Sequence, residues 1–157
     1  MKYISLLVLV VFTACKSSQT ELPLLQNCPG NGDCEVQVFK ETKLLLTEES
    51  SEVSDVSFEE DKDFQVIYIR YKDSKKVDYT EEVYLQIPSR FKEIHSKNHS
   101  LQNQKVVFGK FCDCNEQGFV RINHGELLIV NNKEFISLHL EIKSEKNQVI
   151  QVIDLDI

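Results

Sequence analysis

The chain has 157 residues, of which 41% are hydrophobic, and it carries a formal net charge of −7 at pH 7. That length suits one domain with its own hydrophobic core. The acidic balance argues against a nucleic-acid-binding surface and against electrostatic docking to anionic lipid, because both need clustered Lys and Arg.

The first fifteen residues have the pattern of an export signal. Lys2 precedes an apolar stretch, residues 4–12, in which only Ser5 is polar, and small residues then lead to Cys15. A positive start, a short apolar core and a small-residue cleavage site are typical of a secretory signal, and the core is too short to span a bilayer as a mature helix. We therefore expect residues 1–14 to be removed as a signal peptide.

The end of this segment, Thr13-Ala14-Cys15, resembles the lipobox of bacterial lipoproteins. The resemblance implies that Cys15 becomes the first mature residue and carries acyl chains such as palmitate. Several chains would hold the protein stably at a membrane. We expect a lipid-anchored protein of the bacterial cell envelope, at the outer membrane, on either face. Residues 15–27 have no apolar period and read as a tether.

Four cysteines remain after Cys15, and in an oxidising compartment an even set predicts disulfides. Cys112 and Cys114 lie two residues apart in a strand-like run, so a bond between them would strain the backbone. We therefore expect both to pair with the turn-rich loop that Cys28 and Cys34 enclose. Two local bridges, Cys28–Cys34 and Cys112–Cys114, are the alternative. A four-cysteine zinc site is disfavoured because the CxxC-like knuckles are missing.

From residue 35 onward the chain predicts successive β-strands. In the segment 80–87, Glu81, Val83, Leu85 and Ile87 share one face, and one side of this strand is mostly buried. The strand patterns occupy residues 36–38, 44–46, 64–71, 80–87, 105–114, 119–123, 126–130, 135–142 and 148–157.

Two of these strands carry further expectations. In residues 105–114, Val106 and Phe108 share a face that Lys110 interrupts, and a bulge would fit beside Gly109. The last strand, residues 148–157, is expected to pair inside a sheet because its apolar side would otherwise be exposed.

Residues 47–63 contain eight acidic residues against one lysine. A calcium site is one interpretation, but the segment lacks the glycine turn and the alternating ligand order of an EF-hand loop. We expect a solvated, mobile connection. A weak strand containing Val53, Val56 and Phe58 is the alternative.

Residues 88–104 are the second polar region, in which one or two helical turns are expected. His95 and His99 would then lie on one helix face and could share a metal ion. No third ligand is near them in the sequence, so we expect solvated side chains and no metal site. His124, in a turn, and His139, on the polar face of a strand, are expected at the surface.

Eight or nine strands, short turns and no long amphipathic helix predict an all-β protein. An antiparallel β-sandwich formed by residues 28–157 as a single domain is our expectation, with a small lipocalin-like barrel as the alternative.

The chain has a CPGNGDC loop, an all-β domain and a GKFCDC strand. In these features it resembles small lipoproteins of Bacteroidota-type bacteria that have no assigned activity. The resemblance implies a disulfide-bearing β domain on a lipid anchor. The chain has no nucleophile elbow, HExxH motif or phosphate-binding glycine loop. We hypothesise a non-catalytic binding or accessory domain without a cofactor, whose partner is an envelope protein or glycan. The alternative is an inhibitor of secreted enzymes, or a small envelope enzyme with a loop-built site.

Overall fold

The computed structural model describes residue 25, residues 28–132 and residues 134–157. The expected signal peptide and Cys15 lie outside this part of the chain, as does the expected tether apart from Leu25. Leu25 is buried against the main hydrophobic core, so the packed domain includes a residue that precedes Cys28. No helix within the described part is long and apolar enough to cross a membrane.

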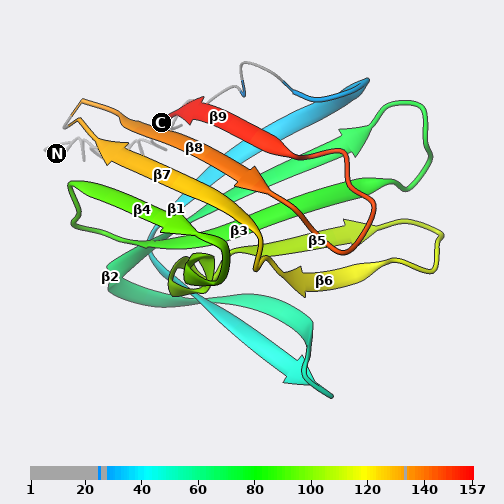
Figure 1. Cartoon of the computed structure of the whole chain (residues 1–157), viewed down its shortest axis with the longest axis horizontal. Coiled ribbons are helices and arrows are strands. Elements are labelled where there is room, and N and C mark those ends of the chain that lie inside the picture. Colours follow the sequence, from blue (N-terminus) through cyan, green and yellow to red (C-terminus); the bar gives the residue numbers. More distant parts are fainter. Residues whose placement is uncertain (1–24, 26–27, 133) are drawn as a thin grey trace, which may run out of the picture.

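The described residues form two antiparallel sheets that pack face to face (Figure 1). One sheet has the strand order β1-β2-β3-β5-β6, with bounds β1 Gly32–Glu49, β2 Glu52–Asp73, β3 Thr80–Pro88, β5 Val107–Phe111 and β6 Gly118–Arg121. The other has the order β4-β7-β8-β9, with bounds β4 Glu93–Lys97, β7 Gly125–Asn131, β8 Ile136–Ile142 and β9 Val152–Asp156. The predicted all-β sandwich is confirmed, and neither sheet closes into a barrel.

The main core lies between the two sheets. Alternate residues of a strand point to the same side, so the apolar positions of β3 and β8 face one another across the interior. Val83, Leu85 and Ile87 of β3 and Leu138 and Leu140 of β8 are almost completely buried there. The short 3₁₀ helix η1, Asn98–Gln104, contributes a further buried side chain to this core.

Strands β1 and β2 form one long hairpin that bends near its middle. Residue pairs run from Gly32↔Asp73 to Lys40↔Gln65, and the ladder resumes at Thr42↔Glu60. Glu41, at the break, has a φ of +53°, in the left-handed region. A bulge of this kind bends a hairpin and re-aims its far half. We call that far half, residues 42–60, the hairpin arm.

The hairpin arm packs against side chains on the outer face of the five-stranded sheet, and its tip extends past β6 (Figure 1). Its inward side chains, among them Leu44, Leu46 and Val56, form a second cluster with Tyr84 and Val107 of that sheet. The backbone N–H of Leu44 donates to Gln86 Oε1 at 2.8 Å. The prediction of a mobile acidic connection is therefore wrong, because the arm consists of paired strands whose inward apolar side chains are buried or half-buried, while most of its acidic side chains face solvent.

The segment after β3 also differs from expectation. Residues 93–97 form strand β4, which pairs with β7, and only the following residues are helical, as η1. His95 therefore lies on a strand and His99 in the 3₁₀ helix, so the predicted shared helix face is wrong.

Strands β5 and β9 also differ from the predictions. The β3–β5 and β5–β6 ladders run without a register shift past Gly109, so the expected bulge is absent from them. Strand β9 begins at Val152 and pairs with β8 alone, at the edge of its sheet. Its apolar side is nevertheless buried, through Ile153 and Leu155.

Candidate functional site

A buried carboxylate joins the two sheets at one end of the sandwich. Glu81 occupies the first inward-facing position of β3, in phase with the apolar residues that follow it, and its exposed fraction is 0%. Its oxygens accept the backbone N–H of Val149 at 2.7 and 2.9 Å and that of Ile150 at 2.8 Å. The hydroxyl of Tyr79 also donates to it. A buried carboxylate is tolerated only when it is hydrogen-bonded in this way.

Lys110 is the second buried charge of this region. It lies opposite Glu81 in the β3–β5 ladder and is 5% exposed. Its Nζ donates to Glu116 Oε2 at 2.9 Å and lies 5.8 Å from the centre of the Tyr79 ring. The charged residue that interrupts the apolar pattern of this strand is thus neutralised by an acid from the turn between β5 and β6.

Glu116 in turn holds the connection between β8 and β9. Its carboxylate accepts the side-chain amide of Asn147 at 3.1 Å and the backbone N–H of the same residue at 3.3 Å. Lys146 Nζ donates to the backbone carbonyls of Glu116 and Gln117, each at 3.0 Å. The hydrogen bond from Lys110, followed by that from the Asn147 backbone, holds the pKa of Glu116 below its ordinary value.

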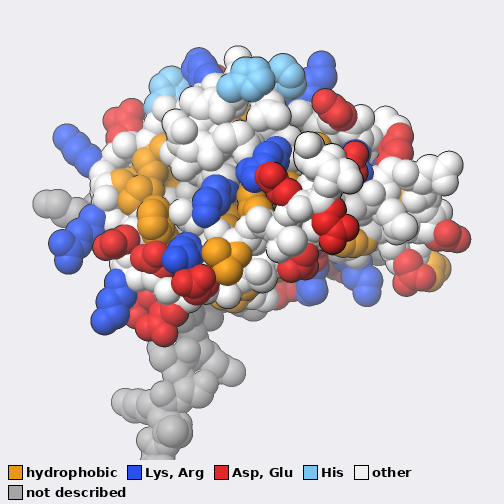
Figure 2. Space-filling view, turned by 90° about the horizontal axis from the view of Figure 1, so that it is seen from below, with side chains coloured by type: hydrophobic (Ala, Val, Ile, Leu, Met, Phe, Trp, Pro, Cys, Tyr) orange, Lys and Arg blue, Asp and Glu red, His pale blue; other side chains and the backbone are white. Residues whose placement is uncertain are grey.

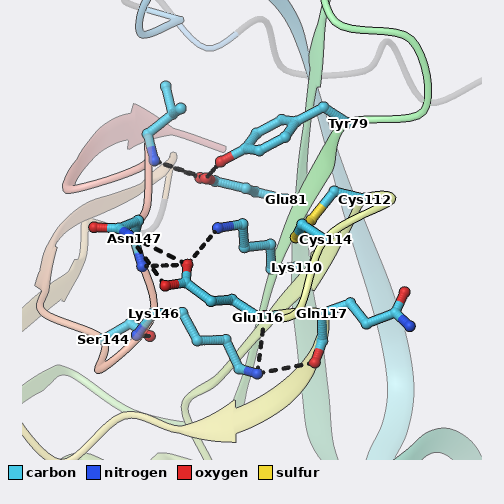
Figure 3. Close-up of polar contacts among 11 residues, drawn as sticks. Tyr79, Glu81, Lys110, Cys112, Cys114, Glu116, Gln117, Ser144, Lys146 and Asn147 are labelled. Carbon is cyan, nitrogen blue, oxygen red and sulfur yellow. Dashed lines mark hydrogen bonds and ion pairs between the residues drawn. A yellow bond between two sulfur atoms is a disulfide. The ribbon is translucent and has the colours of Figure 1, made fainter.

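These contacts form two adjoining hydrogen-bonded groups, one around Glu81 and one around Glu116, and both tie the five-stranded sheet to the β8–β9 connection (Figure 3). We call the residues of both groups the cross-sheet cluster: Tyr79, Glu81, Lys110, Glu116, Lys146 and Asn147. Sequence reasoning did not single out Glu81, although its phase with Val83 marked it as inward-facing. The turn residues of the cluster gave no periodic signal, because their role depends on two segments that meet only in the folded chain.

An open pocket of about 470 Å³ lies beside this cluster. Its walls are the tip of the hairpin arm (residues 51–53), residues 119–121 of β6, and Glu116, Glu145 and Lys146. Arg121 is fixed by hydrogen bonds to Glu48 of the arm at 3.0 Å and to Gln102 of η1 at 3.0 Å. The pocket therefore offers acidic and basic groups, held by neighbouring side chains, together with the apolar Phe119 and Val120.

A single carboxylate, that of Glu82, accepts hydrogen bonds from two tyrosine hydroxyls. Tyr68 and Tyr84 lie 5.0 Å apart, ring centre to ring centre, on the outer face of the five-stranded sheet, and both donate to Glu82. Burial, with the carboxylate as the next cause, raises the pKa of both phenols well above the ordinary value. These phenols remain neutral donors in the folded protein, so the arrangement supports the packing under the hairpin arm.

The histidines are exposed or half-buried. His95 Nε2 lies 2.7 Å from Glu126 Oε1, which Lys97 also contacts at 2.9 Å. Lys97 first, and His95 second, hold the pKa of Glu126 below its ordinary value. His139 pairs with Asp154 at 2.6 Å. The predictions of surface positions for His124 and His139 are confirmed.

The rings of His99 and His124 lie near each other, with their centres 6.0 Å apart. Across the described residues, no group of three or more His, Cys, Asp or Glu side chains is placed to hold a metal ion. The pockets beside the cross-sheet cluster, at the β2–β3 turn and at the β8–β9 connection include no histidine in their walls.

The four described cysteines form two local bridges, Cys28–Cys34 and Cys112–Cys114. The expected pairing between the two segments is wrong, and the alternative pairing is adopted. Strand β5 ends at Phe111, so Cys112 and Cys114 lie in a bend rather than in an extended strand. Their Cα atoms approach to 5.3 Å, within the range that a disulfide requires.

On the face that Figure 2 shows, acidic and basic side chains are interspersed, with apolar patches between them and histidines along one edge. Searches against family models, curated proteins and solved structures found no match for this chain.

Proposed function

We propose that the protein is a lipid-anchored lipoprotein of the bacterial cell envelope whose β domain is a non-catalytic binding module. The export pattern of residues 1–14 and the lipobox-like Thr13-Ala14-Cys15 support the anchor. Acyl chains on Cys15 would attach the domain to the membrane, and each buried methylene contributes about 0.8 kcal/mol. The outer membrane is the proposed location.

The observation that carries the binding role is the pocket beside the cross-sheet cluster. It joins three separate segments of the chain, and the charges around it are fixed by hydrogen bonds, as for Arg121 and Glu116. Fixed donors and acceptors lose little freedom when a ligand binds. The proposed partner is a polar segment of another envelope protein, or a glycan, that presents charged or hydroxyl groups to these side chains.

The binding role is tested by reversing two exposed charges of the pocket, Glu52→Lys and Glu145→Lys. The full-length variant and the wild type are crosslinked in intact envelopes and recovered by an affinity tag. We expect the wild type to recover a partner that the double variant loses by at least tenfold. Glu134→Lys is the matched control, because it reverses an exposed charge in the turn between β7 and β8. Equal recovery by all three proteins, or recovery of the bait alone, contradicts the proposal.

The anchor is tested separately by intact mass spectrometry of the membrane-extracted protein. We expect a chain that begins at Cys15, carries acyl mass and contains no free thiol. Cys15→Ser should shift the protein from the membrane fraction to the soluble fraction. A cytoplasmic protein that retains Met1 and lacks acyl mass contradicts the proposed anchor.

A further inference from the structure

The two disulfides differ in how the fold holds their sulfur atoms. Cys28 and Cys34 are six residues apart and pack against the main core, and Cys34 lies within β1, paired with Tyr71. Cys112 and Cys114 are two residues apart in the turn between β5 and β6. Both are half-buried, and their neighbours Asp113 and Asn115 are exposed. Figure 3 shows this bridge at the end of the β5–β6 hairpin.

The turn bridge is not needed to hold the strands that flank it. Strands β5 and β6 pair from Val107↔Arg121 to Lys110↔Gly118, all on the strand side of the cysteines. A disulfide stabilises a fold less when the loop it closes is shorter, and Cys112–Cys114 closes a very short loop. Reduction should therefore leave the domain folded, with two thiols that small backbone rotations can separate.

The core-packed bridge should behave differently. If Cys28–Cys34 is reduced, its thiols stay close together, because Cys34 is fixed in a paired strand and both residues pack on the core. A fold that holds two thiols together favours their reoxidation, so the bridge whose cysteines lie in a turn beyond the end of β5 is expected to have the more oxidising potential.

We propose that Cys112–Cys114 is an exchangeable disulfide that oxidises dithiols of other exported proteins. This redox activity would be additional to the binding role proposed above, and it rests on the proposed export of the chain. A thiolate of the substrate attacks one sulfur of the bridge, the Cys112–Cys114 bond breaks, and a mixed disulfide forms while the other cysteine leaves as a thiolate. The second substrate thiolate attacks the substrate sulfur of the mixed disulfide, so that the substrate disulfide forms, the mixed disulfide breaks and the remaining domain cysteine leaves as a thiolate. The substrate thereby loses two electrons and two protons, and the domain gains them as two thiols. A disulfide of more oxidising potential is the reactant that restores the bridge.

The first test measures the two bridges in the same full-length, detergent-extracted protein. Samples are equilibrated with mixtures of reduced and oxidised glutathione, alkylated, and mapped by peptide mass spectrometry. We expect the equilibrium constant for reduction by glutathione to be at least tenfold larger for Cys112–Cys114 than for Cys28–Cys34. This corresponds to a difference of about 30 mV between the reduction potentials of the two bridges. Circular dichroism should show the domain still folded when Cys112–Cys114 is half-reduced. Simultaneous reduction of both bridges, or earlier reduction of Cys28–Cys34, overturns the proposal.

The second test measures transfer to a substrate. A synthetic peptide with two reduced cysteines is mixed with an equal amount of protein, and its remaining thiols are counted. We expect the wild type to oxidise about one equivalent of peptide, Cys112→Ser/Cys114→Ser to oxidise none, and Cys28→Ser/Cys34→Ser to retain the reaction. In Cys114→Ser the free Cys112 thiol should form a mixed disulfide with an oxidised peptide. If the Cys28/Cys34 variant does not fold, the mapped reduction of the wild type still decides. Loss of peptide thiols at the same rate with and without Cys112 and Cys114 overturns the proposal.

Discussion

At the scale of single residues, Glu81 has the largest structural role of the charged side chains in the cross-sheet cluster. It accepts hydrogen bonds from Val149, Ile150 and Tyr79, so it ties β3 to the segment that leads into β9. Since this carboxylate is fully buried, removal of its charge leaves two backbone N–H groups facing an amide that can accept fewer hydrogen bonds.

We therefore expect Glu81→Gln to lower the free energy of unfolding by about 3 kcal/mol, measured by urea denaturation. Glu93→Gln is the matched control, because Glu93 is an exposed residue of β4, and its effect should stay below about 0.5 kcal/mol. Equal stabilities for the two variants would show that the hydrogen bonds to Glu81 contribute little.

The lowered pKa of Glu116 should make the stability of the fold depend on pH. Its pKa in the folded protein is lowered, chiefly by Lys110, from an ordinary value of 4.5. The stability that the ionised form contributes is therefore complete above about pH 4.5 and is lost as the pH falls through the lower, folded-state pKa. We expect the gap in urea midpoint between the wild type and Glu116→Gln to be largest near pH 6 and to shrink progressively in stronger acid. A gap that is constant from pH 6 to the acid limit would contradict this linkage.

At the scale of elements, the glycines that begin β6 and β7 allow the cost of backbone strain to be compared with the cost of a steric clash. Gly118 and Gly125 have φ values of +104° and +141°. A Cβ at Gly118 would have no neighbour within 4 Å, whereas a Cβ at Gly125 would lie 2.0 Å from the carbonyl oxygen of Glu141. Position 125 therefore requires glycine both for its backbone conformation and for the close approach of β7 to β8, whereas position 118 requires it for its backbone conformation alone.

Gly118→Ala should cost about 1 kcal/mol of stability, from backbone strain alone. Gly125→Ala should cost about 3 kcal/mol, because the β7–β8 ladder must also move apart. The comparison is made by thermal or urea unfolding of the two purified variants. Equal losses would mean that β8 adjusts to the added methyl group without cost.

The edge strand β9 is expected to be essential even though it pairs with a single neighbour. Deletion of residues 152–157 removes Ile153 and Leu155 from the main core and exposes the paired edge of β8. We expect the truncated protein to lose its cooperative unfolding transition, measured by circular dichroism. Asp154→Asn/Asp156→Asn, which changes only exposed side chains of the same strand, should keep that transition. A truncated protein that melts cooperatively would show that the strand is dispensable.

At the scale of the whole molecule, the sequence predicted the sandwich because alternation within strands such as β3 and β8 reports directly on burial. The sequence did not predict that the hairpin arm forms paired strands that pack on the sheet. The acids of the arm dominate its composition, while Leu44, Leu46 and Val56 are buried only because the bulge at Glu41 turns them onto the sheet. Local composition cannot show a packing surface that a distant strand supplies.

The candidate site was less predictable than the fold for the same reason. The inward phase of Glu81 and the apolar interruption at Lys110 were visible in the sequence, but their partners come from turns far along the chain. The predicted pairing of the cysteines was wrong because it assumed that Cys112 and Cys114 lie in an extended strand. The strand ends one residue earlier, at Phe111, and the bend brings the two residues together.

The tyrosine–carboxylate pairs give the folded molecule an optical property of its own. The chain contains no tryptophan. Every tyrosine in the described part donates its hydroxyl to an acid, in the pairs Tyr68–Glu82, Tyr71–Asp73, Tyr79–Glu81 and Tyr84–Glu82. An electronically excited phenol is a much stronger acid and passes its proton to a neighbouring carboxylate, so the native protein should emit red-shifted tyrosinate fluorescence that reverts to ordinary phenol emission when the chain unfolds.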